Sequence, residues 1–420
     1  MRAGNSLTVL LMAVCLGACT GEAPGQKWRV LPIESPAAIG SAEPHLQAGA
    51  DETIILSWLE STAARTTLRY SVYQDMAWSR PQTVASGDDW FVNWADFPSV
   101  TRIGNDLWAA HWLQKRPGGP YAYDVKISLS SDGVNWQPAI SPHDDGTPTE
   151  HGFVSMIELG ETLGAVWLDG RNTAQTGGHD MGNDMGKMAG DAANGGMSLR
   201  WATIDGSGQV LDSIELDSLI CDCCQTDLTS LSDGVAVVYR DRSENEIRDI
   251  WITRLTDSGW SEPALVANDG WQIAGCPVNG PAIDSRNDKL AVAWFTGAGE
   301  VRQVKLAFSD DGGKQFSEPV TISSGTALGR VDVSWVADGL AVISWLDELD
   351  KGIAALKIRT VARNGELGEP QEIALTGNQR SSGFPHMLRA GNDLLFAWTE
   401  TGEQSRVLTA RLSLAEIFAE

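Results

Sequence analysis

Leu290-Ala-Val-Ala-Trp294 is one of seven short apolar runs in this chain that end in an aromatic residue. The other runs end at Trp58, Trp112, Trp167, Tyr239, Trp345 and Trp398, so the steps along the sequence are 54, 55, 72, 55, 51 and 53 residues. A repeat of about 50 residues that is rich in β-branched and aromatic residues is typical of a β-propeller, in which each unit forms one blade. The sequence therefore predicts an all-β fold with seven blades.

The repeat that contains Trp294 divides into four apolar segments separated by turn residues. The segments are residues 281–284, 289–295, 303–309 and 317–322, with Asn, Asp and Gly in the connections. This pattern predicts four strands in each blade. An open β-solenoid and a row of β-sandwiches are the alternatives, and the single period that runs along the whole chain disfavours both.

The last repeat supplies only three strand segments, near residues 385–388, 394–398 and 406–412. An additional apolar segment, Trp28 to Ile33, precedes the first repeat and has no partner of its own. We expect this segment to pair into the last blade, because pairing removes an open sheet edge and closes the ring. If one repeat were displaced, a six-bladed ring would result.

Composition and charge limit the partners that the chain can have. Among the 420 residues, 31 are basic and 55 are acidic, so the net charge is −24. The sequence contains no cluster of basic residues that would offset this charge locally, which argues against nucleic acid and anionic membrane surfaces as partners. We expect residues 28–420 to form a single propeller domain and the protein to be a monomer.

The N-terminus has the features of an export signal. Residues 1–18 contain Arg2 followed by an apolar stretch too short to span a bilayer as a helix. The sequence Leu16-Gly-Ala-Cys19 is similar to a bacterial lipobox, in which the cysteine is lipidated and becomes the first residue of the mature protein. It predicts a signal peptide over 1–18, lipidation at Cys19, a tether over 19–27, and a location on the bacterial cell envelope that faces the periplasm or the exterior. The lipid anchor would be the only contact with the membrane, and an ordinary secretory signal is the alternative.

Two predicted turns carry a recognisable motif. Ser309-Asp-Asp311-Gly-Gly-Lys-Gln-Phe316 fits the pattern Ser-x-Asp-x-Gly-x-x-Trp/Phe, and residues 130–136 form a variant that is one residue shorter. These turns resemble the Asp-box (BNR) repeats of the sialidase superfamily, over roughly residues 40 to 413. The resemblance implies a propeller fold, and it implies that Asp132 and Asp311 are structural residues that bind turn amides.

In such a ring, the links into each first strand and the loops after each second strand share one face, which we call the loop face. The resemblance places the binding site there, and arginine pairs suit carboxylates such as that of sialic acid. We expect the loop face to bind a glycan or another anionic ligand, although its arginines would alternatively form ion pairs between blades. The candidate binding residues are Trp90, Trp94, Asp96, Arg171, Arg240, Asp241, Arg242, Asn279, Arg330 and Arg380.

Catalysis of the sialidase type is an alternative to simple binding. The resemblance implies a tyrosine nucleophile with a glutamate partner and a second acidic residue. Tyr239 occupies the position of the repeated tryptophans, so Tyr121 and Tyr123 are the remaining candidates, and the sequence shows no evident glutamate partner for either. The family's Arg-Ile-Pro-like opening is replaced by Glu43-Pro44-His45. If the protein is an enzyme, we expect an exo-α-sialidase type of glycoside hydrolase.

Four cysteines lie beyond the leader and Cys19. Cys221, Cys223 and Cys224 precede the fourth repeat's first strand, and Cys276 precedes that of the fifth. In an oxidising compartment this pattern predicts at least one disulfide between the two blades. Alternatively, the thiolates would bind a soft metal or take part in redox chemistry.

The long step of 72 residues reflects an insert at about 172–196 that is rich in Gly, Met and His. Thioether and imidazole groups suit copper(I), so copper is the one cofactor that the sequence suggests. The candidate copper ligands are His179, Met181, Met185 and Met188.

Overall fold

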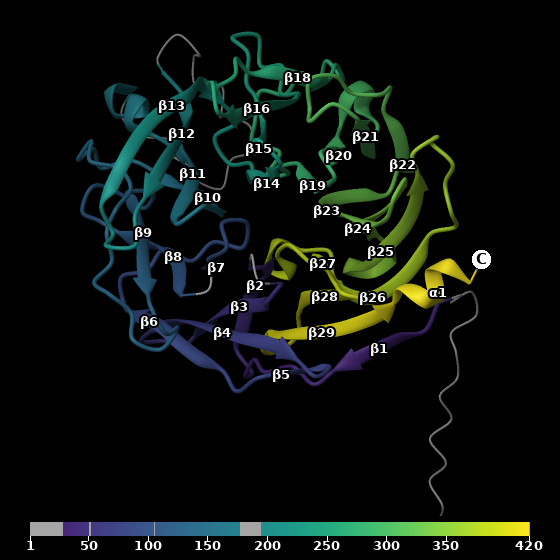
Figure 1. Ribbon diagram of the computed structural model, residues 1–420, viewed down its shortest axis with the longest axis horizontal. Coiled ribbons are helices and arrows are strands. Elements are labelled where there is room, and N and C mark those ends of the chain that lie inside the picture. Colours follow the sequence, from purple (N-terminus) through teal and green to yellow (C-terminus); the bar gives the residue numbers. More distant parts are fainter. Residues whose placement is uncertain (1–27, 50–51, 105, 177–194, 420) are drawn as a thin grey trace, which may run out of the picture.

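The computed structural model describes residues 28–49, 52–104, 106–176 and 195–419. The chain forms seven antiparallel sheets arranged as blades around a central axis (Figure 1). The prediction of seven blades is confirmed, and the six-bladed, solenoid and sandwich alternatives are wrong. The leader, Cys19, the tether up to residue 27 and the four candidate copper ligands lie outside the described residues.

The first half of the ring holds blades 1 to 3. Blade 1 contains β2 (Ser41–Ala48), β3 (Ile54–Ser61), β4 (Thr66–Gln74), β5 (Ala77–Trp78) and β6 (Gln82–Gly87). Blade 2 contains β7 (Ser99–Ile103), β8 (Leu107–Lys115) and β9 (Tyr123–Ser130). Blade 3 contains β10 (His151–Leu159), β11 (Thr162–Asp169), β12 (Met197–Ile204) and β13 (Val210–Ile220), with the short 3-10 helix η1 (Arg171–Thr176) after β11.

The second half holds blades 4 to 7. Blade 4 contains β14 (Asp227–Leu231), β15 (Gly234–Arg240), β16 (Ile250–Thr256), β17 (Gly259–Trp260) and β18 (Ala264–Ala267). Blade 5 contains β19 (Ala282–Arg286), β20 (Lys289–Thr296), η3 (Ala298–Glu300), β21 (Gln303–Ser309) and β22 (Val320–Ser324). Blade 6 contains β23 (Ala327–Ala337), β24 (Leu340–Glu348), η4 (Asp350–Gly352), β25 (Ile353–Ala362) and β26 (Gln371–Gly377). Blade 7 contains β1 (Val30–Ile33), η5 (Arg380–Ser382), β27 (His386–Ala390), β28 (Asp393–Glu400) and β29 (Arg406–Ser413), followed by α1 (Leu414–Phe418).

The ring closes as the sequence predicts. β1 pairs antiparallel with β29, so that Val30 lies opposite Leu412 and Ile33 opposite Thr409. Trp28, just before β1, is 4% exposed and packs with residues of blades 6 and 7 and of α1. The two ends of the described chain therefore complete one blade together (Figure 1).

The repeated aromatic residues lie near the end of the second strand of each blade, one to three residues before its last residue. Trp58, Trp167 and Trp294 are fully buried, and Tyr239 is 1% exposed. These strands read as unbroken apolar runs because each second strand is covered by the neighbouring blades on both faces. The core of the ring thus consists of layers between blades rather than one central nucleus.

Blade 2 departs from the predicted pattern because it has three strands. Residues 131–150 take the place of a fourth strand, with isolated bridges between Ile127 and Ile140 and between Tyr123 and Glu150. This segment, called the blade 2 loop below, crosses from β9 to the first strand of blade 3.

The two motif turns are held by their aspartates. Asp132 Oδ1 accepts hydrogen bonds from the amides of Val134 and Asn135 at 2.8 and 2.7 Å. Asp311 Oδ1 accepts bonds from the next turn amides in the same way, at 3.0 Å each. Both aspartates therefore have a structural role. Among the described residues, no helix has the length and apolar character needed to cross a membrane.

Candidate functional site

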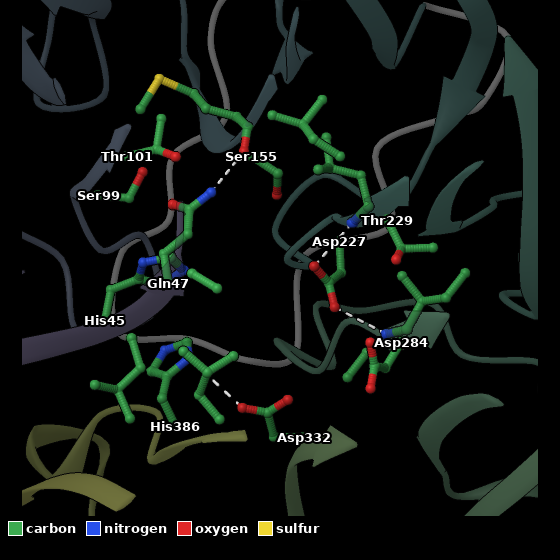
Figure 2. Close-up of a pocket in the computed structure, with 18 of the residues that line it drawn as sticks. His45, Gln47, Ser99, Thr101, Ser155, Asp227, Thr229, Asp284, Asp332 and His386 are labelled. Atoms are coloured by element: carbon green, nitrogen blue, oxygen red, sulfur yellow. Dashed lines mark hydrogen bonds and ion pairs between the residues drawn. The ribbon is translucent and has the colours of Figure 1, made fainter. Parts of the chain in front are cut away.

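The first strands of all seven blades line a cavity of about 820 Å³ on the axis of the ring, called the axial channel below (Figure 2). First strands alternate between side chains that face the channel and side chains that face the blade core. Hydroxyl, amide, carboxyl and imidazole groups from all seven blades meet in this space; those labelled in Figure 2 include Gln47, Ser99, Thr101, Ser155 and Thr229. The channel is therefore lined by groups that can donate and accept hydrogen bonds.

Three aspartates on neighbouring first strands form the acidic side of the channel. Each carboxylate accepts a hydrogen bond from an amide on the next first strand along the ring, so it also ties two blades together. The bonds run from Ile283 to Asp227 at 2.8 Å, from Trp335 to Asp284 at 2.7 Å and from Met387 to Asp332 at 2.8 Å.

Burial in the ring raises the pKa of these carboxyl groups. The pKa of Asp227 rises to about 7 and that of Asp284 to about 6, while that of Asp332 lies well above its ordinary value. For Asp227 the negative charge of Asp284 adds to this effect, and for Asp332 the charges of Asp227 and Asp284 do, because a nearby like charge disfavours ionisation. Near neutral pH, these groups can therefore act as hydrogen-bond donors as well as acceptors.

Two histidines lie beside the aspartates. The rings of His45 and His386 meet edge to face at 4.7 Å, and His386 Nδ1 lies 3.8 Å from Asp332 Oδ2. Burial lowers the pKa of His45 to about 4 and holds that of His386 well below its ordinary value, so both imidazoles are neutral. His45 Nδ1 and His386 Nε2 have no hydrogen-bond partner among the described residues.

Aromatic rings gather at the end of the channel where the first strands begin. Phe97 and Phe384 line the cavity there, with centroids 5.9 Å apart. Trp94 stacks on Phe384 at 5.8 Å, and the guanidinium of Arg330 lies 4.9 Å from the Trp94 ring. Such faces can pack against the apolar faces of a ligand that also carries polar edges.

Most arginines predicted to bind a ligand instead bind the protein itself. Arg240 is 2% exposed and donates to the carbonyl oxygens of Asn279, Arg248 and Phe295 at 2.9, 2.6 and 2.7 Å. Arg330 is 6% exposed; it donates to Ser382 Oγ at 2.6 Å and to the carbonyl oxygens of Gly383 and Gln379 at 2.8 and 3.1 Å. These bonds join neighbouring blades. Arg240 and Arg330 therefore hold the blades together, as in the alternative interpretation, and do not form a ligand site.

Arg242 and Arg171 also pair within the protein. Arg242 Nη1 lies 3.1 Å from Asp222 Oδ2 and its Nη2 lies 2.5 Å from Glu246 Oε1. Arg171 binds Asp169 at 2.7 Å. The ion-pair alternative therefore applies to both of these arginines.

The remaining predicted residues have mixed surroundings. Trp90 is buried against Trp112, and the Asn279 side chain accepts a bond from the Arg330 amide at 2.8 Å. Asp96 Oδ1 accepts a bond from the amide of Phe153 at 2.8 Å, while Oδ2 is buried without a partner among the described residues. Burial raises the pKa of Asp241 to about 7. Of the predicted set, Arg380 is exposed, with its guanidinium 6.0 Å from the Trp94 ring, and Trp94, Arg171 and Asp241 are partly exposed.

Tyr123 has the glutamate partner that the sequence did not reveal. Its hydroxyl donates to Glu150 Oε1 at 2.5 Å, and burial raises the pKa of Glu150 to about 7. The Tyr123 side chain is fully buried, with Phe91 stacked on its ring at 4.0 Å. Tyr121 lies edge-on to Phe91 at 6.0 Å. Tyr239 is a core residue, as expected, and donates to Asp217.

The four cysteines pair as two disulfides. Cys223 bonds to Cys276 with a Cα separation of 6.1 Å, which confirms a bridge between the links into blades 4 and 5. Cys221 bonds to Cys224 within the triplet. In this oxidised form the four sulfur atoms are used, so a metal site on free thiolates requires prior reduction.

Apart from the cysteines, the described residues bring possible metal ligands within 4.8 Å of one another in two groups. One contains Asp124, His143 and His151, and the other contains Asp145, His151 and Asp169. Both lie around the blade 2 loop and the start of β10.

Comparison with protein-family models and with curated protein sequences finds no match. Similar solved structures include the polysaccharide lyase Uly1, with 9% identity, coverage of 94% of each chain and a TM-score of 0.53. An α-L-arabinanase from Penicillium chrysogenum complexed with arabinobiose has 11% identity, covers 92% of this chain and 99% of its own, and gives a TM-score of 0.48. A subtype N10 neuraminidase-like protein of a little yellow-shouldered bat strain has 9% identity. The alignment covers 92% of this chain and 97% of that protein, and the TM-score is 0.46. At these identities the likeness shows the propeller fold.

Proposed function

We propose that this protein is a glycan-binding β-propeller that holds a hydroxyl-rich saccharide in the axial channel. The observation that carries the proposal is the lining of the channel, where neutral imidazoles and carboxyls of raised pKa lie among hydroxyl and amide groups. A sugar hydroxyl both donates and accepts hydrogen bonds, and so do these groups in their uncharged forms. Few precisely placed polar groups and some aromatic surface are typical of ligand pockets.

The charge of the channel favours an uncharged saccharide over an anionic one. An anionic ligand would find no free arginine in Arg240 and Arg330, which are bonded within the ring, and it would be repelled by whichever of Asp227, Asp284 and Asp332 is ionised. The arginines in the lining are Arg102, Arg286 and Arg389, and they lie toward the ends of their first strands. An anionic ligand such as sialic acid is therefore a poorer fit to this channel than a neutral oligosaccharide.

The proposal is tested by screening neutral, sialylated and uronic oligosaccharides on an array and by measuring the best one by calorimetry. Gln47→Trp fills the channel and is expected to weaken binding at least tenfold, because Gln47 lies on the channel wall (Figure 2). Gln209→Trp is the matched control, since Gln209 is exposed outside the channel. Absence of binding to every saccharide, or equal weakening by both variants, would overturn the proposal.

The Tyr123–Glu150 pair favours a second candidate function, glycoside hydrolysis of the sialidase type. A tyrosine beside a glutamate can act as a nucleophile when it reaches the sugar. Because the hydroxyl of Tyr123 is buried, we expect turnover of a fluorogenic sialoside to be absent or very slow. Turnover that is lost in Tyr123→Phe and retained in Tyr121→Phe would show instead that the pair is catalytic.

We also place the protein on the bacterial cell envelope, anchored through Cys19. Cys19→Ala is expected to release the protein from membranes or to leave the leader attached, because the lipid is added to this sulfur. Membrane fractionation and intact mass spectrometry measure both outcomes. An unmodified wild-type protein in the soluble fraction would contradict the lipobox interpretation.

The channel carboxyls also predict a pH dependence of stability. Asp227 has a pKa of about 7 in the folded state, whereas an unfolded aspartate titrates near about 3.9. Its stabilising contribution is therefore complete below about pH 4 and is lost as the pH rises toward 7. The full difference corresponds to about 4 kcal/mol, and because the side chain is only partly buried we expect on the order of 2 kcal/mol.

Asp227→Asn removes this titration and keeps an oxygen for the amide of Ile283. As the pH rises from about 4 to about 7, the wild type is expected to lose free energy of unfolding relative to the variant, because only the wild type carries the titrating carboxyl group. Urea titrations at several pH values measure the difference between the two proteins. A difference that stays constant over this range would show that the group titrates normally.

A further inference from the structure

Four side chains of the metal-binding types meet where the blade 2 loop joins blade 3. His143 and Asp145 come from the loop, His151 is the first residue of β10, and Asp169 is the last residue of β11 and pairs with His151 in the sheet. The side chains of His151 and Asp169 are fully buried, and those of His143 and Asp145 are 3% and 8% exposed. We call these four residues the loop cluster.

Three members of the loop cluster, Asp145, His151 and Asp169, have ligand atoms within 4.8 Å of one another, and His143 adjoins them through Asp145. Asp145 Oδ2 lies 3.0 Å from His151 Nε2 and 3.4 Å from His143 Nδ1, and Asp169 Oδ1 lies 3.8 Å from His151 Nε2. Bonds of about 2.0–2.1 Å in a tetrahedral zinc site place neighbouring ligand atoms about 3.3 Å apart. Small side-chain adjustments would therefore bring the atoms of Asp145, His151 and Asp169 around one metal ion, and His143 would complete the set after a larger change of its ring orientation.

The orientation of His151 independently favours a cation. Its Nδ1 lies 3.2 Å from the carbonyl oxygens of Tyr123 and Thr149, so this nitrogen carries a hydrogen atom. The lone pair of neutral His151 then points from Nε2 toward Asp145 and Asp169, two carboxylates that Arg171 also contacts at 3.4 and 2.7 Å. A metal ion or a proton on Nε2 would remove the repulsion between this lone pair and the carboxylates. A metal-binding histidine commonly has this arrangement, with its other nitrogen donating to a backbone carbonyl.

His143 provides a further observation. Its ring stacks on that of His151 with centroids 3.9 Å apart and an angle of 3° between the planes, so two positively charged rings would repel at this distance. His143 Nε2 is buried without a hydrogen-bond partner among the described residues. Because an imidazole binds a metal ion in the plane of its ring, His143 has to tilt out of this stack before it can share an ion with His151.

We propose that the loop cluster binds one divalent transition-metal ion, with zinc as the best match, and that this ion fastens the blade 2 loop to blade 3. Two imidazole nitrogens and two carboxylate oxygens form a ligand set that zinc accepts. Arg171 donates to both oxygens of Asp169 at 2.7 and 2.8 Å, which orients this carboxylate in the way that an outer hydrogen bond orients a metal ligand. The ion would hold in place the segment that replaces the missing strand of blade 2.

The competing explanation is that His151 is protonated and forms a salt bridge without any metal. The two explanations are separated by measuring the metal content of full-length protein purified from zinc-supplemented cells and passed over a desalting column. We expect about one zinc per chain, and Co²⁺ in its place should give the visible spectrum of a tetrahedral site. Removal of the metal with a chelator should lower the melting temperature and expose residues 131–150 to protease.

The test variants are Asp145→Asn and His151→Gln, which keep size and some hydrogen bonding while removing a ligand. Both are expected to retain less than about a tenth of the zinc and to show the lower melting temperature without chelator. His386→Gln, which removes a buried histidine elsewhere, and His179→Ala, in the Met/His insert, are the controls and should retain the metal. Wild-type protein free of zinc, or zinc retained equally by all four variants, would overturn the proposal.

Discussion

Deletion of residues 28–33 is expected to prevent the chain from forming a stable ring. The deletion removes the four residues of β1 that pair with β29, and it removes Trp28 from the contact between blades 6 and 7. Loss of one buried tryptophan costs about 3–5 kcal/mol, and the lost strand pairing adds to that cost. Because the net stability of a domain is about 5–15 kcal/mol, most of it would be lost, and an open edge would be exposed to aggregation.

Thermal unfolding followed by circular dichroism, together with gel filtration, measures this outcome. A chain lacking residues 20–25 is the matched control, because that deletion lies outside β1 and should leave the melting temperature unchanged. A synthetic peptide of residues 27–35 added to the truncated chain should restore part of its stability. A truncated chain that melts like the wild type would show that β1 does not close the ring.

Loss of the bridge between blades 4 and 5 is expected to have the second-largest effect. The Cys223–Cys276 bond joins residues 53 positions apart and restricts the unfolded chain accordingly. The double replacement of both cysteines by alanine is therefore expected to lower the free energy of unfolding by about 2–5 kcal/mol. Replacing both partners avoids a lone thiol that would form other bonds.

The second disulfide offers a control within the same segment. Cys221 and Cys224 are only three positions apart, so their bond restricts the unfolded chain much less. The pair Cys221→Ala and Cys224→Ala should cost clearly less than the first pair in guanidinium titrations. Equal losses in the two double variants would mean that packing of the segment, rather than the crosslink between blades, is responsible.

The blade count was predictable because of where the second strands lie. β20, for example, is covered on both faces, so its sequence is an unbroken apolar run from Leu290 to Phe295 that includes Trp294. That signal does not depend on loops or on distant contacts. Closure was predictable for the same kind of reason, since an unpaired apolar segment at 28–33 and a three-stranded last repeat complement each other.

The allocation of the arginines was not predictable. The sequence places Arg240 and Arg330 near the correct face, but it does not show which groups they bind. Arg240 reaches carbonyl oxygens up to 55 positions away along the chain, and such contacts depend on how two blades meet. A large number of arginines on the loop face is therefore equally compatible with a ligand site and with hydrogen bonds between blades.

Two other features left different traces in the sequence. Asp227 and Asp284 each occupy a channel-facing position of a first strand, so the alternation within these short strands could have revealed the channel. The loop cluster left no recognisable motif, because two of its ligands lie in an irregular loop and two at strand ends. The repeat that forms the three-stranded blade 2 has an ordinary length, so the spacing between the repeated aromatic residues did not indicate that a strand is missing.

The pairing of β1 with β29 has a consequence for the order of events during protein synthesis. Of the described strands, β1 is the first to be synthesised, whereas its partner, Arg406–Ser413, is the last. Blades 1 to 6 can each assemble from consecutive segments, but the N-terminal strand has to wait until almost the whole chain has been made. Contacts of such large sequence separation form slowly. The newly made chain therefore carries an unpaired apolar strand throughout its synthesis, and this is the interval in which we expect it to depend most on chaperones.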